Sequence, residues 1–372
     1  MTNIEEGSSS HEVSNDQEIS EVETKGVLPG DKALQNLLDC VVRSNDRKAK
    51  FSPIYMVPSK LRDVNPSSFT PRVVSIGPLH TKLENLKLME NKKATYPSQL
   101  LDEVGSPPGE TLINCVQKVT GSIENIRSYY FEMKPFTDDE LIQMMILDGC
   151  FILQFIYNLS KTGNVVSNNP LRSRNIALDL VLLENQIPFF VLQDIYDLTL
   201  KKLQQKHTLT TLLSKLLELV NPFEQPLNVD PNVGTKKTHH ILGLLHKVYK
   251  PNFDAPKKSI IPRAYSTVDL DEVGVKISPN KNLIWPMAIE FESSMFWGKP
   301  TLKIPVVRID NFFEVVLRNL IAYEQYSFVH NYVRSYAMAL DMLIATPENI
   351  GKLEKSVDEY SSVQQELLGQ KY

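Results

Sequence analysis

Cysteine is scarce in this sequence, because the 372 residues include only Cys40, Cys115 and Cys150. Their number is odd, they lie far apart, and no CxxC pair or Cys/His cluster occurs. These features exclude a disulfide framework and a structural zinc site of the usual spacing. We therefore expect reduced, buried thiols.

Long apolar runs are also missing. No window of about 18 residues is both apolar and free of charge, as a membrane-spanning helix requires. The acidic, serine-rich start has no basic region followed by an apolar stretch, so a secretory signal peptide is not indicated. From these features we expect a soluble, intracellular protein of the cytoplasm.

An excess of basic charge is absent as well, since 40 Lys+Arg face 44 Asp+Glu and the net charge is −4. Seven acids and one lysine give residues 1–25 a charge of −6, so the remainder sums to +2. A nearly neutral body argues against nucleic acid as a partner. We expect residues 1–30 to form a disordered acidic tail and residues 31–372 to form a single domain.

The common short motifs of catalysis and phosphate binding are missing too: no P-loop, GxGxxG, HExxH, GxSxG or EF-hand pattern occurs. Three acids stand out because they lie in apolar surroundings, namely Asp148, Glu184 and Glu324. Desolvation raises the pKa of such an acid towards that of a general acid. An enzyme that uses Asp148 or Glu184 is therefore an alternative. We favour a structural role, in which each acid pairs with a base such as Arg318 or caps a helix.

Histidines and lysines give weaker signals. His239 and His246 lie two helical turns apart, too far for joint zinc ligation, so we interpret them as solvated or core side chains. The pairs Lys201–Lys202, Lys236–Lys237 and Lys257–Lys258 are typical of a solvated surface, with a weak patch for phosphate or an acidic partner as the minor alternative. We predict no metal site and no cofactor.

Apolar residues recur at helical spacing through most of the chain, which predicts a mainly α fold. Thr137 and Glu140 have the spacing of a capping box, and Asn311 is expected to cap the last long helix. Pro97 should kink one helix and Pro188 should bend or restart another. The expected helices are Lys32–Ser44, Leu83–Leu101, the run from Thr137 through Ile156, the run from Ile176 through Leu198, His239–Tyr249, Phe312–Ile344 and one that starts at Thr346-Pro347.

The apolar spacing then changes to alternation, which predicts a small β element near residues 273–309. The alternating residues are Val273, Val275 and Ile277, followed by Leu302, Ile304 and Val306. Pro305 has no N–H to donate, so we expect the last strand at a sheet edge. The predicted fold class is therefore mainly α with a small β element, an α-dominated α+β fold.

Five short signatures follow one another between residues 50 and 350. They are Pro71–His80 with Leu88–Lys93, Met145–Leu153, Leu182–Leu192, Val273–Lys276 and Leu317–Gln325. Together they resemble the signatures of a plant-specific family, the plant domain of unknown function 247. The resemblance implies a mostly helical plant protein with no established catalytic residues. The polar residues within these signatures then have structural roles: Asp148, Glu184, Asn185, Gln186, Arg318, Asn319 and Glu324.

Members of this family are usually membrane-associated through a hydrophobic helix near the C-terminus. Such a helix is missing after about residue 350 here, so we expect a chain cut short of the anchor. Some grass members are implicated in pollen–stigma self-incompatibility, which implies recognition rather than catalysis. We therefore predict a non-enzymatic plant protein that recognises a protein partner or signals, with a self-incompatibility-like role as one form of that recognition.

Overall fold

The computed structural model describes residues 33–34, 37, 52–105, 107–162, 170–203, 208–232, 238–251, 265–281, 285–293, 298–327 and 329–356. The chain divides into two compact units, Met1–Lys50 and Phe51–Tyr372. Residues 33, 34 and 37 of the first unit are helical, within the predicted helix Lys32–Ser44. The predicted acidic tail lies outside the described residues, and so do Lys236–Lys237 and Lys257–Lys258.

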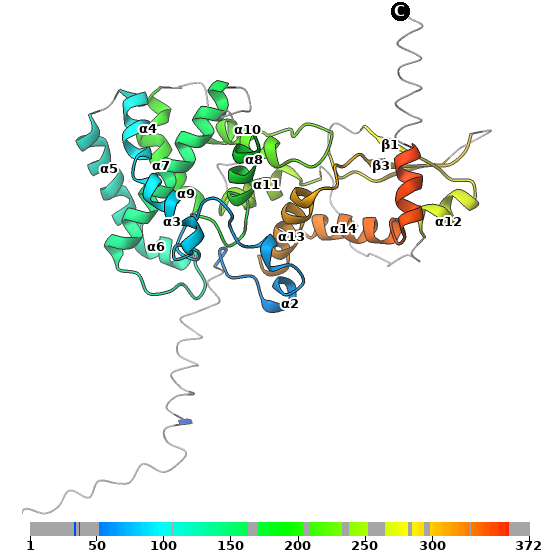
Figure 1. Ribbon diagram of the computed structural model, residues 1–372, viewed down its shortest axis with the longest axis horizontal. Coiled ribbons are helices and arrows are strands. Elements are labelled where there is room, and N and C mark those ends of the chain that lie inside the picture. Colours follow the sequence, from blue (N-terminus) through cyan, green and yellow to red (C-terminus); the bar gives the residue numbers. More distant parts are fainter. Residues whose placement is uncertain are drawn as a thin grey trace, which may run out of the picture. The chain divides into compact units, whose positions relative to one another are not determined.

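Helices dominate the second unit and a small sheet completes it, as the predicted fold class requires (Figure 1). The α-helices are α2 Ser59–Arg62, α3 Lys87–Lys93, α4 Tyr96–Val104, α5 Pro108–Thr120, α6 Ile123–Ser128, α7 Asp138–Thr162, α8 Pro170–Asp179, α9 Phe189–Leu198, α10 Leu209–Val220, α11 Ile241–Val248, α12 Thr267–Glu272, α13 Asn311–Tyr326 and α14 Tyr332–Leu343. The short 3-10 helices are η1 Pro66–Ser68, η2 Glu84–Leu86 and η3 Leu200–Lys202. The strands are β1 Lys276–Asn280, β2 Glu290–Glu292 and β3 Thr301–Pro305.

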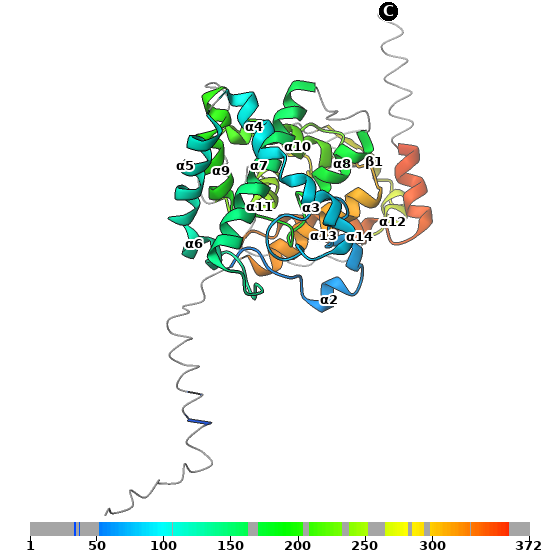
Figure 2. The same cartoon turned by 60° about the vertical axis from the view of Figure 1, so that its left-hand side comes forward.

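Helix α7 forms the centre of the helical part and packs against α4, α5, α9 and α10 (Figures 1 and 2). The predicted capping box begins it: Thr137 N donates to Glu140 Oε2 at 2.8 Å, and Glu140 N donates to Thr137 Oγ1 at 3.2 Å. Among the described residues, this helix alone is long and apolar enough to cross a membrane, but 78% of its apolar window is buried in the fold. Its apolar surface therefore serves as the core.

Two runs predicted as helices are each broken into two helices. The run Leu83–Leu101 is interrupted between α3 and α4, and Pro97 lies in the first turn of α4, where its missing N–H breaks no helical bond. The run from Ile176 is also broken, because α8 ends at Asp179 and α9 begins only after Pro188. Residues 180–188 are non-helical and buried throughout. Their apolar pattern therefore reflects burial on all sides and not a helix face.

The last long helix predicted, Phe312–Ile344, is two helices, α13 and α14. Its cap is Asp310 and not Asn311, because Asp310 Oδ1 accepts the N–H groups of Phe312 and Phe313, each at 2.9 Å. The aspartate precedes the first helical residue and so has the extended backbone of a cap. The helix predicted to start at Thr346-Pro347 is confirmed, since residues 347–356 are helical.

The sheet has the strand order β1-β3-β2, with β1 parallel and β2 antiparallel to β3. The first strand begins at Lys276, later than predicted, because Val273 caps the end of α12. The edge position inferred for the last strand is wrong, since β3 lies in the middle. Pro305 is tolerated there because it is the final residue of β3, where only β1 still pairs with it.

Candidate functional site

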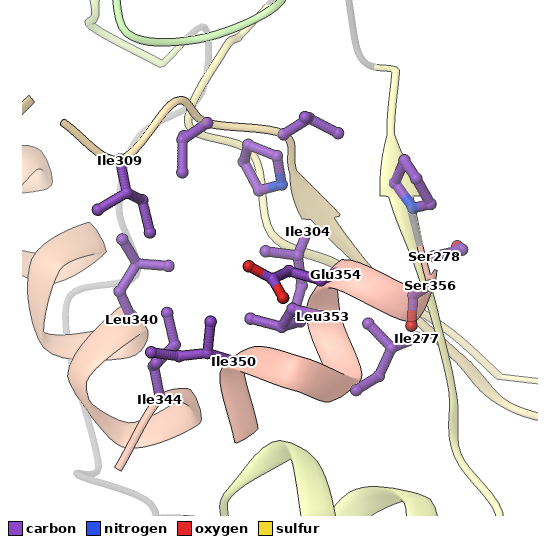
Figure 3. A pocket seen from close by; sticks show the side chains of 14 residues that line it. Ile277, Ser278, Ile304, Ile309, Leu340, Ile344, Ile350, Leu353, Glu354 and Ser356 are labelled. Atoms are coloured by element: carbon purple, nitrogen blue, oxygen red, sulfur yellow. The ribbon is translucent and has the colours of Figure 1, made fainter. Parts of the chain in front are cut away.

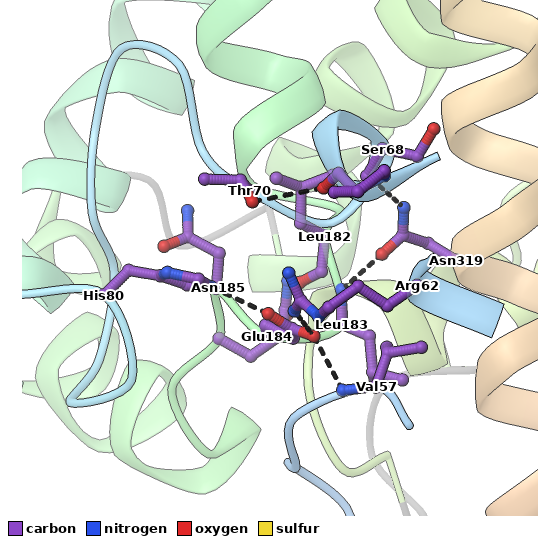
Figure 4. Close-up of polar contacts among 12 residues, drawn as sticks. Val57, Arg62, Ser68, Thr70, His80, Leu182, Leu183, Glu184, Asn185 and Asn319 are labelled. Carbon is purple, nitrogen blue, oxygen red and sulfur yellow. Dashed lines mark hydrogen bonds and ion pairs between the residues drawn. The ribbon is translucent and has the colours of Figure 1, made fainter. Parts of the chain in front are cut away.

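Buried polar side chains hold together segments that are distant in sequence. We name six of them the polar junction: Asp148, Asp179, Glu184, Asn185, Gln186 and Asn319. All six are buried, and each binds backbone groups of the surrounding chain. Five of them, all but Gln186, form hydrogen bonds with the segment 57–80, which precedes α3. Figure 4 shows the part around Glu184 and Asn319.

Glu184 lies in the buried turn between α8 and α9 and has no exposed surface. Its Oε1 accepts the backbone N–H of Val57 at 2.6 Å and pairs with Arg62, while its Oε2 lies 2.9 Å from His80 Nε2 (Figure 4). A carboxylate without solvent needs such donors, because its desolvation is costly. The bases that pair with Glu184 are thus Arg62 and His80, whereas Arg318 was the base suggested from the sequence.

Asp179 and Asn185 hold the strand-like segment before Gly77. The carboxylate of Asp179 accepts three consecutive backbone N–H groups, those of residues 72–74, at 2.7–3.2 Å. Burial raises the pKa of Asp179 to about 6, although the three donors favour the ionised form. Asn185 Oδ1 accepts the N–H of Ile76 at 2.7 Å, and its Nδ2 donates to the carbonyl of Val74 at 3.0 Å. The two side chains therefore satisfy a segment that has no sheet partner there.

Gln186 closes the turn from inside. Its Nε2 donates to the carbonyls of Leu180 and Leu182 at 2.8 and 2.7 Å. The backbone carbonyl of Gln186 accepts a hydrogen bond from the hydroxyl of Tyr130 at 3.0 Å. The same carbonyl oxygen lies only 2.3 Å from where a Cβ on Gly77 would stand, and Gly77 has a positive φ of 71°. Glycine is therefore required at this contact between the segment 72–80 and the turn.

Asp148, on the central helix α7, pairs with a buried lysine. Lys93 Nζ donates to Asp148 Oδ1 at 2.6 Å and also to the carbonyl of Ser75, while Gly77 N donates to Asp148 Oδ2 at 2.7 Å. Burial raises the pKa of Asp148, and Lys93 opposes that effect. Burial lowers the pKa of Lys93, but the neighbouring carboxylates of Asp148 and Glu90 outweigh this effect, so that the pKa of Lys93 is raised. The pair is thus an internal tether of the segment 75–77 to α7.

The remaining predicted residues lie on α13. Asn319 Oδ1 accepts the N–H of Leu183 at 2.8 Å, and its Nδ2 donates to the carbonyl of Ser68 at 2.7 Å (Figure 4). Glu324 accepts the N–H groups of Val333 and Arg334 at 2.8 Å each, so it caps the start of α14. Arg318 pairs neither with a residue of the polar junction nor with Glu324. It is half-buried and pairs with Glu314 one turn earlier, at 2.8 Å.

Three histidines in or next to α11 bind side chains or backbone of the fold. His246 Nε2 lies 3.0 Å from Glu324 Oε1, and His239 Nδ1 lies 2.9 Å from the hydroxyl of Tyr323. His240 caps α11: its Nδ1 accepts the N–H of Gly243 at 3.1 Å. Within the described ranges no group of three or more His, Cys, Asp and Glu side chains could hold a metal ion.

The two described thiols offer no ready nucleophile. Cys115 and Cys150 are free and buried, as expected from the sequence, and Cys40 lies outside the described residues. Burial raises the pKa of Cys115 to about 11 and that of Cys150 to about 12. Both side chains are therefore thiols at neutral pH, and the thiolate is the reactive form.

Sequence reasoning missed Arg62, His80, Lys93, Asp179 and His240. Lys93 could have been found, because it lies on the same face of α3 as Met89, and both side chains are buried. Asp179 also stood in an apolar run. Arg62 and His80 carry no such signal, since their turn-like segments look like ordinary surface.

Two clefts open on the surface at the other end of the second unit, and neither is lined by residues of the polar junction. The first, which we name the apolar groove, has a volume of about 540 Å³ and lies between the sheet, α14 and the helix 347–356 (Figure 3). Its walls include Ile277, Ile304, Leu340 and Leu353, and the carboxylate of Glu354 lies among these side chains (Figure 3).

The second cleft, which we name the lysine cleft, has a volume of about 620 Å³. It is lined by Lys276, Lys299, Lys352 and Lys355 and by one carboxylate, that of Asp271. Ile277 and Ser356 line both clefts, so the two clefts are neighbours.

The fold and the polar junction define a mainly helical protein whose buried acids and amides fasten its N-terminal segment to its helices. The profile of a family described as "Plant protein of unknown function", the domain of unknown function 247, matches residues 54–357. The chain belongs to this plant family, as its five signatures indicated.

Two curated relatives come from Arabidopsis thaliana. UPF0481 protein At3g47200 is 29% identical over 327 residues, which are 80% of this chain and 66% of the relative. Putative UPF0481 protein At3g02645 is 27% identical over 226 residues, which are 59% of this chain and 42% of the relative. The chain thus spans less than two thirds of either relative. No solved structure is significantly similar to it.

Proposed function

We propose that this plant protein is a non-enzymatic recognition protein that binds a partner protein in the apolar groove. The observation that supports this proposal is where the polar residues of the signatures lie and what they bind. Asp148, Glu184, Asn185, Gln186 and Asn319 are buried and bound to internal groups, so they hold the fold and offer nothing to a substrate.

The groove has the chemistry of a recognition site. Ile309 and Ile350 line it and remain exposed, which is unfavourable unless a partner covers them. Glu354 is exposed beside them and makes no ion pair with any described residue. We therefore infer that the occupant is a segment of another protein with apolar side chains and one lysine or arginine that meets Glu354. Self-recognition, as in the grass members that the signatures resemble, is one form of this function.

Affinity capture from plant tissue at native expression, followed by mass spectrometry and by binding of the purified partner, tests the proposal. The double variant Ile309→Asp with Ile350→Asp should bind at least about tenfold more weakly, because it places charge in the groove. Ile113→Asp is the control: Ile113 is 57% exposed, compared with 64% and 39% for Ile309 and Ile350, and lies outside the groove. Recovery of no specific partner, or equal binding by the double variant, would contradict the proposal.

The alternative function, an enzyme that uses the buried carboxylates, predicts a different result for a variant of Glu184. The variant Glu184→Gln should lose stability without losing any turnover, because Glu184 contacts only internal groups. A variant that folds normally and loses a measurable turnover would show that Glu184 is part of an active site.

A further inference from the structure

The lysine cleft gathers positive charge from three separate segments. Lys276 begins β1, Lys299 precedes β3, and Lys352 and Lys355 lie one turn apart on the helix 347–356. The fold therefore brings together four ammonium groups from three segments that are separate in the sequence, in a chain whose net charge outside residues 1–25 is only +2.

Most of this charge is not neutralised within the described part of the chain. Asp271 is the only carboxylate in the lining, and it pairs with Lys352. Lys276, Lys299 and Lys355 are exposed and make no ion pair with a described residue. The carboxylate of Glu354 lies in the apolar groove and not in this cleft. Like charges in one concave site repel one another and raise the local positive potential, which concentrates anions there.

We propose that the lysine cleft binds a small ligand that carries two or more phosphate groups. Three unpaired ammonium groups call for several negative charges close together, which a single carboxylate does not supply. Lysine suits phosphate because its ammonium is a compact charge with three rotatable donors. A volume of about 620 Å³ is within the usual range of small-molecule sites. This proposal rests on the four lysines, none of which lines the apolar groove, and it does not depend on the proposed protein recognition.

Calorimetric titration of the full chain with inorganic tripolyphosphate at physiological ionic strength tests the proposal. We expect one site per chain. The double variant Lys276→Gln with Lys355→Gln should weaken binding at least about tenfold, because it removes two charged donors. Both side chains are exposed and make no ion pair in the described part of the chain, so the fold should tolerate the change. The control is Lys201→Gln with Lys202→Gln, an exposed pair in η3 outside the cleft, and should leave binding unchanged.

A variant with the opposite effect makes the test sharper. Asp271→Asn removes the carboxylate from the lining and releases Lys352, so tripolyphosphate should bind more tightly. Absence of saturable binding, several sites per chain, equal losses in both lysine double variants, or unchanged affinity in Asp271→Asn would each overturn the proposal.

Two soluble probes then distinguish the source of the phosphates. One is inositol trisphosphate, and the other is a short-chain phosphoinositide with the same headgroup. Tighter binding of the phosphoinositide would assign the ligand to a lipid whose chains reach the neighbouring apolar groove, past Ile277 and Ser356. Equal binding of the two would assign it to a soluble phosphate compound. Both results support the phosphate site, and binding of neither would contradict it.

Discussion

Mild acid should destabilise this protein through His240. This side chain is fully buried, and its two ring nitrogens have fixed roles. Nδ1 accepts the N–H of Gly243 at 3.1 Å, so the proton is on Nε2, which donates to the carbonyl of Pro53 at 3.2 Å. A second proton would have to go to Nδ1 and would break the helix cap. Burial accordingly lowers the pKa of His240 to about 3.

The size of the effect follows from linkage. Below pH 6.5 the unfolded chain takes up a proton at His240 and the native state does not, so the unfolded state binds more protons. The free energy of unfolding therefore falls as the pH falls, by about 1.4 kcal/mol per pH unit between about 6.5 and 3. Between pH 7 and pH 5 the loss from this one group is about 2 kcal/mol.

Asp179 changes the stability in the opposite direction. It therefore partly masks the effect of His240 when the stability of the wild-type protein is plotted against pH. Its pKa is raised to about 6 from 3.8, so the native state takes up its proton first and gains stability as the pH falls between these values. The contribution of His240 must therefore be read from a difference between two proteins. The variant His240→Asn is suitable, because asparagine still accepts the N–H of Gly243 as a cap but does not titrate.

Urea unfolding, followed by tryptophan fluorescence and circular dichroism from pH 7 to pH 5, provides the measurement. At pH 7 the variant should be less stable by about 2–4 kcal/mol, because it loses ring contacts and the bond to Pro53. At pH 5 this difference should have shrunk by about 2 kcal/mol. Parallel stability curves for the two proteins would refute the neutral, buried state of His240.

Two further pairs of variants each compare a buried, closely packed site with a more exposed one, and the free energy of unfolding is measured with urea. Glu184→Ala should lose about 3–5 kcal/mol, because it leaves buried donors unpaired, whereas Glu314→Ala, at a half-exposed ion pair, should lose less than about 1 kcal/mol. Gly105→Ala should cost about 1 kcal/mol, since its φ is +62° but space is open around it. Gly77→Ala should lose about 1–3 kcal/mol more, from the clash with the Gln186 carbonyl. Equal losses within either pair would contradict the packing described.

The helical framework could be predicted because the two faces of most helices meet different environments, the apolar core on one side and solvent on the other. Apolar residues therefore recur at helical spacing. The capping box at Thr137, the central helix around Asp148 and the helix that starts at Pro347 all follow from short-range spacing. The turn 180–188 could not be predicted in this way. It is buried on all sides, and the side chains of Gln186 and Asn319 bind its backbone groups, while Asn185 binds the carbonyl of Asp179 just before it. These side chains replace helical hydrogen bonds.

The partners of the acids are hidden from the sequence for a different reason. Lys93 is 55 residues from Asp148, and Arg62 is 122 residues from Glu184. No local period relates residues at such separations, so the sequence shows that an acid in apolar surroundings needs a base but not which one. Arg318 was an attractive candidate by composition, yet a neighbour one turn away, Glu314, satisfies it locally.

One signature differs from the others in where its side chains go. Pro71–His80, Met145–Leu153, Leu182–Leu192 and Leu317–Gln325 supply or contact the polar junction. Val273–Lys276 does not, because Gly274, Val275 and Lys276 line the lysine cleft. A signature needed only for folding would point into the core, as the first four do. Part of this signature serves the fold as well, because Gly274 has a positive φ of 83° and Val275 is buried. The side chain of Lys276 is exposed instead and makes no ion pair with a described residue, so a structural role does not account for it, whereas the anionic ligand proposed for the cleft would.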